Sequence, residues 1–161
     1  MIRTRYHTRA SDPRDAADAP RRAPVILATL SVRVDPSAER MAIESALDAG
    51  SCLIVANMMM LPQLPTTLIL AREYATLPHE EDLEEVRATA RRAAACGVAT
   101  ELLRISSRRP LQALIELVEE REAGLLVLGP DPHRTPRWWR ALAARRIRRR
   151  ARCLVWIAPD G

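Results

Sequence analysis

Residues 25–56 read VILATLSVRVDPSAERMAIESALDAGSCLIVA and carry the pattern of one strand–helix–strand unit. The apolar runs at 25–30 and 52–56 are short and continuous, as is typical of strands buried on both faces of a sheet. Between them, Asp35 is a suitable N-cap and Pro36 suits the first helical position. The stretch therefore predicts two parallel strands joined by a helix.

The same alternation continues along the rest of the chain. The further elements that we expect are helices at residues 80–96, 110–123 and 137–150, strands at 98–104, 125–128 and 153–157, and a short helix at 67–76. Five apolar strands that alternate with helices predict an α/β, doubly wound fold with one parallel sheet, helices on both faces and right-handed crossovers. Ligands of such sheets bind beyond the carboxyl ends of the strands.

Composition indicates a single soluble globular domain. The chain has 161 residues, of which 48% are hydrophobic and 28% charged, which excludes a wholly disordered or collagen-like protein. All of its 25 basic residues are arginine. The absence of lysine excludes Schiff-base chemistry and a P-loop lysine.

The sequence also favours a cytoplasmic protein with no membrane segment. The most apolar stretch, residues 58–70, is broken by two prolines and is too short to cross a bilayer. The three cysteines are widely separated and form no C-x-x-C pair, which is typical of a reducing compartment. Residues 1–23 show no periodicity, so we expect a disordered N-terminal tail followed by one domain at 24–161.

Two strand sequences resemble those of the universal stress protein (UspA-like) family. Residues 123–129, AGLLVLG, are similar to that family's A-D-L-I-V-x-G strand, and residues 151–157, ARCLVWI, to its final A-P-C-P-V-L-V strand. The order of elements from Pro24 to Ile157 matches as well. The resemblance implies a flavodoxin-like, Rossmann-like five-stranded sheet of order 3-2-1-4-5 and a homodimer joined through the last strand. It also implies ATP or another adenine nucleotide as a cofactor in some members.

The nucleotide motif of the family is degenerate in this chain. ATP-binding members carry G-x2-G-x9-G-[ST] after the fourth strand and an aspartate at the end of the first. Gly129 matches the first glycine, but the second falls on Pro132 and the third on Ala141 or Leu142, while Ser31 occupies the aspartate position. We therefore expect weak or lost ATP binding. The nucleotide-contacting candidates are Ser31, Gly129, Arg134 and Arg137. Gly129 could equally serve only to turn the chain out of the sheet. A serine at a strand end, such as Ser31, is more often a turn former.

The basic residues are concentrated near the C-terminus. Nine arginines and no acid lie between Arg134 and Arg152. Helical spacing directs Trp139, Leu142, Ala143 and Ile147 toward the core and leaves Arg137, Arg140, Arg145, Arg148 and Arg149 outward. This outer face could be solvated, bind an anion, or pair with the acids at 80–85 within the chain or in a dimer. No recognition motif or exposed aromatic platform is evident, so nucleic acid is disfavoured.

No catalytic or metal-binding pattern is present in the sequence. G-x-S-x-G, H-E-x-x-H, Walker A and G-x-G-x-x-G are all missing, and the three histidines are dispersed. We therefore expect a non-catalytic regulatory or interaction module. A homodimer would cover the apolar edge formed by Leu154, Val155, Trp156 and Ile157. The alternatives are a divergent adenine-nucleotide-binding stress protein that uses arginine side chains for phosphate, and an anion or nucleic-acid surface on the arginine-rich helix.

Overall fold

One sheet runs through the computed structural model, which describes residues 2–7, 22–29, 34–60, 80–129 and 137–158. Its elements are β1 (Ile2–His7), β2 (Val25–Thr29), α1 (Pro36–Ala49), β3 (Leu53–Met60), α3 (Glu80–Ala95), β4 (Thr100–Ser107), α4 (Pro110–Glu120), β5 (Leu125–Leu128), α5 (Arg137–Arg150) and β6 (Leu154–Ile157). The helix expected at 67–76 lies outside the described residues. Among the helices described, none has the length and apolar character needed to cross a membrane.

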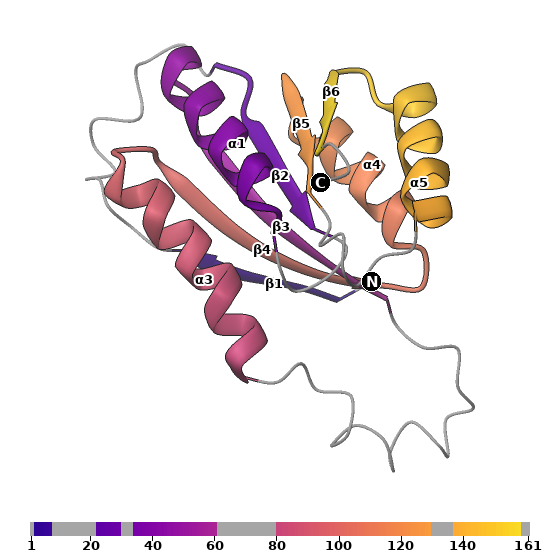
Figure 1. Cartoon of the computed structure of the whole chain (residues 1–161), viewed down its shortest axis with the longest axis horizontal. Helices are drawn as coiled ribbons and strands as arrows, with labels where there is room; N and C mark the ends of the chain where they lie inside the picture. Colours follow the sequence, from indigo (N-terminus) through magenta and orange to yellow (C-terminus); the bar gives the residue numbers. More distant parts are fainter. Residues whose placement is uncertain (1, 8–21, 30–33, 61–79, 130–136, 159–161) are drawn as a thin grey trace.

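The sheet has the strand order β1-β4-β3-β2-β5-β6. The five strands β4, β3, β2, β5 and β6 run parallel to one another. When they are numbered along the chain from β2, their order in the sheet is the predicted 3-2-1-4-5. Helices α1 and α3 cover one face, and α4 and α5 cover the other (Figure 1). The predicted doubly wound α/β fold is therefore confirmed.

Strand β1 is a sixth strand that the sequence analysis did not predict. It pairs antiparallel with the outer edge of β4, from Ile2 opposite Ser106 to His7 opposite Glu101. Residues 2–7 therefore do not belong to a disordered tail, and residues 8–21 lie outside the described part of the chain. The physical reason is that the open edge of β4 offers backbone groups to a strand. The sequence IRTRYH also alternates between Ile, Thr or Tyr and basic residues, which is the two-residue period of a strand.

The core consists of two layers, one on each face of the sheet. Along β2, Val25 and Leu27 belong to the layer under α1 and α3, whereas Ile26 and Ala28 belong to the layer under α4 and α5. All four side chains are buried. Burial on both faces explains why the strands read as continuous apolar runs.

Helix α1 begins as the sequence predicts and ends at a glycine. Asp35 Oδ1 accepts hydrogen bonds from the backbone N–H groups of Ser37 at 2.8 Å and Ala38 at 3.2 Å, and from the Ser37 hydroxyl. At the other end, Gly50 adopts a left-handed conformation with φ of 55°. A side-chain N-cap and a left-handed glycine satisfy the free backbone groups at both ends of the helix.

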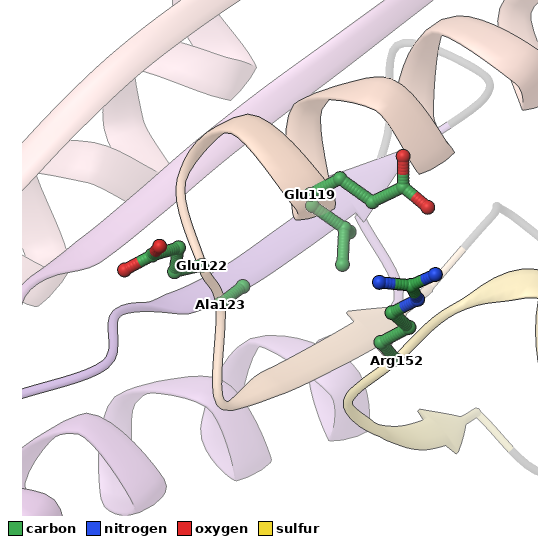
Figure 2. A pocket seen from close by; sticks show the side chains of 5 residues that line it. Glu119, Glu122, Ala123 and Arg152 are labelled. Atoms are coloured by element: carbon green, nitrogen blue, oxygen red, sulfur yellow. The ribbon is translucent and has the colours of Figure 1, made fainter.

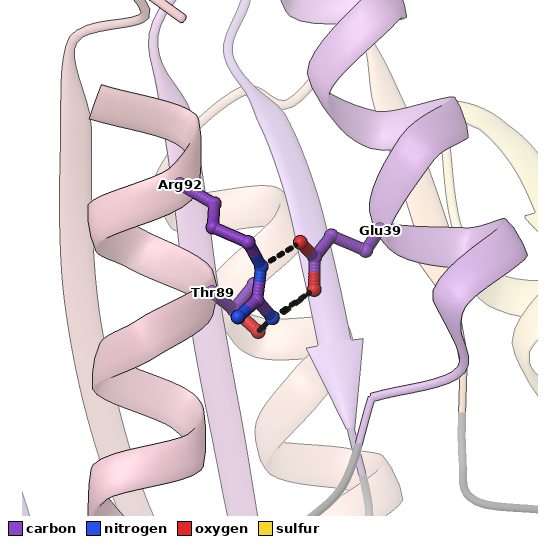
Figure 3. A network of polar contacts seen from close by, with 3 residues as sticks. All are labelled: Glu39, Thr89 and Arg92. Atoms are coloured by element: carbon purple, nitrogen blue, oxygen red, sulfur yellow. Dashed lines mark hydrogen bonds and ion pairs between the residues drawn. The ribbon is translucent and has the colours of Figure 1, made fainter. Parts of the chain in front are cut away.

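A partly buried polar contact ties α1 to α3 (Figure 3). The Glu39 carboxylate accepts hydrogen bonds from Arg92 Nε at 2.5 Å and Nη2 at 2.7 Å, and from Thr89 Oγ1 at 3.0 Å. The hydrogen bond from Arg92 lowers the pKa of Glu39 despite its partial burial. Because bidentate arginine–carboxylate pairs have a defined geometry, this contact fixes the position of one helix relative to the other.

Strand β3 is longer than predicted. We expected it to end at Ala56 and a loop to follow, but it continues to Met60 and pairs with β4 as far as Ser107. The cause is the length of β4, which offers a partner to every residue of this extension. As a result, Asn57 lies within a strand and is buried.

Candidate functional site

Three neighbouring strands carry polar residues side by side, at the level where β2 ends. Thr29 of β2 is the register partner of Asn57 of β3, which in turn is the partner of Arg104 of β4. Side chains alternate between faces along a strand, and the neighbouring core residues place all three on the face covered by α1 and α3. We call Thr29, Asn57 and Arg104 the polar row.

Asn57 is the member of the polar row with a buried side-chain oxygen that lacks a hydrogen-bond partner among the described residues. Its side chain is only 4% exposed, and its Oδ1 has no hydrogen-bond donor among the described residues. A buried acceptor without a partner costs about 1–3 kcal/mol. An amide in this state is suited to a ligand that brings its own donor.

Arg104 places a positive charge at one end of the polar row. Its Nε lies 3.0 Å from Met59 Sδ, and it contacts no carboxylate in the described part of the chain. The side chain is partly buried. A guanidinium that is not neutralised by a carboxylate can attract an anionic group next to Asn57.

Gly129 lies at the same edge of the sheet, where β5 ends against α1. Its N–H donates to the Ala28 carbonyl at 3.1 Å, and its carbonyl accepts from the Asp35 N–H at 3.2 Å. A Cβ at this position would lie 2.3 Å from the Cβ of Ala38, so only glycine fits. Because the N–H is already hydrogen-bonded, a phosphate here would need donors from other residues.

The other motif positions are only partly described. Ser31, Pro132 and Arg134 lie outside the described residues, and of Arg137 only the backbone is described, as the first residue of α5. The positions that match the third glycine, Ala141 and Leu142, lie inside α5. Only the first-turn N–H groups of a helix are free to bind a ligand. The backbone at 141–142 therefore does not form the phosphate cradle that the family motif describes.

The predicted core face of α5 needs one correction. Ala143 and Ile147 are fully buried, as expected, but Leu142 is 54% exposed. The buried stripe of α5 is narrow, and Leu142 lies beside it on the side that faces the start of α4. The side chain of Trp139 lies outside the described residues.

Where their side chains are described, the outward arginines of α5 contact no described acid of α3. Arg145, Arg148 and Arg149 are exposed, and the side chains of Arg137 and Arg140 are outside the described part. The two helices cover opposite faces of the sheet (Figure 1). The alternative in which these arginines pair with the acidic helix of the same chain is therefore wrong for the described residues.

A hollow lies at the opposite edge of the sheet (Figure 2). It has a volume of about 430 Å³ and is lined by Val118, Glu119, Glu122, Ala123 and Arg152. Glu119 and Arg152 lie on the same side of the loop, while Glu122 points away. This hollow is next to the amino end of β5, so it is separate from the polar row. Among the described residues, no group of three His, Cys, Asp or Glu side chains could hold a metal ion.

Comparison with solved structures places the fold. A universal stress protein in complex with cAMP has a TM-score of 0.61 at 24% identity, covering 86% of this chain and 98% of its own. A universal stress protein family member from Burkholderia pseudomallei has a TM-score of 0.52 at 25% identity, and the match covers 84% of this chain and 95% of that protein. The universal stress protein from Archaeoglobus fulgidus in complex with dAMP has a TM-score of 0.54 at 20% identity, and the match covers 84% of this chain and 96% of that protein.

Sequence comparison alone does not reach this result, because no protein-family model and no curated protein matches the chain. The structural likeness extends over nearly the full length of each of these relatives. The chain therefore has the fold of the universal stress proteins, and its resemblance to the UspA-like family is confirmed.

Proposed function

We propose that the protein is a non-catalytic, universal-stress-protein-like regulatory module that binds an adenine nucleotide weakly at the polar row. The observation that carries this proposal is the buried Oδ1 of Asn57, which has no hydrogen-bond partner among the described residues and lies beside the carboxyl end of β2. An asparagine amide offers one acceptor and one donor, which match the N6 amino group and N7 of adenine. The complexes of related proteins with cAMP and dAMP support the same ligand class.

The nucleotide that we expect to bind best is a monophosphate. Pro132 has no N–H, and the residues that match the third glycine lie inside α5, so a backbone cradle for a triphosphate is not supported. A single phosphate can be bound by arginine side chains. Arg104 is suitably close to Asn57, and Arg134 and Arg137 remain candidates from the sequence.

Titration calorimetry with AMP, ATP and GMP tests this proposal. We expect AMP to bind at least as tightly as ATP and more tightly than GMP. Asn57→Leu should weaken AMP binding by about tenfold or more, because a bidentate base contact contributes about 1–3 kcal/mol. The same variant should leave the unliganded protein equally or more stable, because it removes a buried unpaired oxygen.

Ser51→Ala is the matched control for Asn57→Leu. Ser51 Oγ is also buried without a partner among the described residues, but Ser51 lies between α1 and β3, at the other edge of the sheet. Its replacement should not change AMP affinity. Undetectable AMP binding to the unaltered protein, or full AMP affinity in Asn57→Leu, would overturn the proposal.

We also propose a homodimer through β6. This strand is at the edge of the sheet and pairs only with β5 among the described strands. Leu154 is 75% exposed, and Val155, Trp156 and Ile157 are partly exposed. An apolar edge strand of this kind favours pairing with another chain. Sedimentation equilibrium should give a dimer, and Trp156→Arg should shift it toward the monomer; a monomeric unaltered protein would contradict this.

Absence of catalysis is a separate part of the proposal. It is supported by the missing catalytic motifs in the sequence. Incubation with ATP, followed by chromatography of the nucleotides, should give no ADP or AMP beyond a protein-free control. Turnover that survives repurification would show instead that the module is an enzyme.

A further inference from the structure

A groove between α4 and α5 lies on the other face of the sheet from the polar row. It is lined by Met60, residues 109–112, Leu142, Arg146 and Arg150, and has a volume of about 520 Å³. Met58 belongs to the core layer under α4 and α5, and alternation along β3 puts Met60 on that same face. The groove is therefore separate from the proposed nucleotide site.

The floor of the groove is apolar and exposed. Met60 is 61% exposed and Leu142 is 54% exposed. Trp138, at 69% exposed, lies one helical turn before Leu142 on the same side of α5. These are three of the five large apolar side chains that are exposed in the described part of the chain. Exposed apolar side chains that gather in one place indicate an interaction surface, and methionine adapts its shape to a partner.

The rim of the groove is positively charged. Arg109, Arg146 and Arg150 are exposed, and none of them contacts a carboxylate in the residues that the structure describes. Arg150 Nη1 donates to Gln112 Oε1 at 3.0 Å, which orients this guanidinium across the groove. Glu116 of α4 accepts a hydrogen bond from Gln112 Nε2 at 3.2 Å. The groove thus combines an apolar floor with a cationic rim.

We propose that this groove binds an acidic, amphipathic helical segment of a partner protein. Apolar side chains of the partner would contact Met60 and Leu142, and its carboxylates would pair with the arginines of the rim in the bidentate geometry that arginine favours. From Leu142 to Arg150, α5 extends about 12 Å, enough for roughly two turns of a partner helix.

Two other occupants fit the groove less well. The acidic helix of a second copy, α3, has its apolar residues Val86, Ala90 and Ala93 buried in its own core, so these described side chains are not free to enter the groove. A polynucleotide would use the charge of the whole helix, including Arg145 and Arg149, and would not need the apolar floor. The position of exposed Met60 and Leu142 inside the groove therefore favours a protein segment.

The experiment is a fluorescence anisotropy titration of the full chain with labelled peptides of roughly 15 residues. The first peptide carries leucines at i, i+4 and i+8 with glutamates beside them. The second has every glutamate replaced by glutamine, and the third has the same composition in scrambled order. A labelled oligothymidylate is the fourth probe. We expect only the first peptide to bind well, with at least about tenfold weaker binding of the second and third.

Two charge-reversal double variants distinguish binding in the groove from attraction by the net charge of α5. Arg146→Glu with Arg150→Glu should weaken binding of the first peptide by at least about tenfold. Arg145→Glu with Arg149→Glu changes the net charge equally on the same helix, outside the groove, and should change binding by less than about threefold. Leu142→Ser should weaken binding without changing the charge.

Three results would overturn the proposal. The first is no binding of the acidic peptide to the unaltered protein. The second is an equal loss of binding in both charge-reversal variants, because this would mean attraction by net charge alone. The third is tighter binding of the oligothymidylate than of the peptide, which would identify a nucleic-acid surface. Circular dichroism of each variant distinguishes loss of binding from loss of the fold.

Discussion

Helices α3 and α5 each carry several arginines, but among the described side chains only those of α3 contact carboxylates. Arg87 and Arg91 lie 2.6 and 3.1 Å from the carboxylate of Glu84, and Arg92 contacts Glu39 of α1. On α5, none of the described arginine side chains contacts a carboxylate, and Arg150 donates only to Gln112. The same residue type therefore stabilises the protein itself on one face and is left for solvent or a partner on the other.

The attachment of α5 to the sheet depends on its apolar residues. Ile147 is fully buried in the layer that also contains α4, so Ile147→Ala should lower the free energy of unfolding by about 2–5 kcal/mol through lost burial and a residual cavity. Urea denaturation measures this change. Leu142→Ala, on the same helix but exposed, is the control and should change the value by less than about 0.5 kcal/mol. Equal effects of the two variants would mean that α5 is not held by this face.

The attachment of α3 depends in part on a polar contact. Glu39→Ala removes the acceptor of Arg92 and Thr89, and leaves the buried Thr89 hydroxyl without this partner. We expect the free energy of unfolding to fall by about 1–3 kcal/mol. Glu44→Ala, at an exposed position of the same helix, should have an effect below about 0.5 kcal/mol. If the two substitutions are equivalent in urea denaturation, the contact between α1 and α3 contributes nothing to stability.

The fold could be predicted from the sequence because its central strands are buried on both faces. Residues 25–28 and 125–128 are continuous apolar runs, and Asp35 marks the start of α1. Strand β1 could not be found in this way, because it is an edge strand whose partner, β4, is distant in the sequence. Its alternating sequence is a signal, but the arginines within it resemble the composition of a tail.

The candidate site was only partly predictable. The switch-point rule points to the same edge of the sheet as the polar row, but Thr29, Asn57 and Arg104 were not recognised as a group. Their proximity comes from strand register, which a single sequence does not provide. One signal was available, since Asn57 is the one polar residue in the run LIVANMMM. A polar side chain in an otherwise apolar buried strand is a reason to look for a ligand.

The contact of α3 with α1 should also depend on pH. The Arg92 hydrogen bond holds the pKa of Glu39 below its ordinary value of 4.5, so the stabilisation is fully present above that pH and is lost as the pH falls through the pKa of the folded state. The difference in thermal midpoint between the unaltered protein and Glu39→Gln should therefore be greatest near neutral pH and narrow below pH 4.5. A difference that stays constant through this range would show that Glu39 acts through packing and not through its charge.

The smallest effect is expected for the arginines of α5. Arg145→Gln with Arg149→Gln removes two exposed charges that contact no carboxylate among the described residues, so the free energy of unfolding should change by less than about 0.5 kcal/mol. Arg92→Gln on α3, which loses the bidentate contact with Glu39, is the comparison and should be clearly less stable. Since neighbouring positive charges on α5 repel one another, the double variant could be slightly more stable than the unaltered protein. A loss as large as that of Arg92→Gln would mean that the charge of α5 is needed by the fold, and the argument that it is left for a partner would fail.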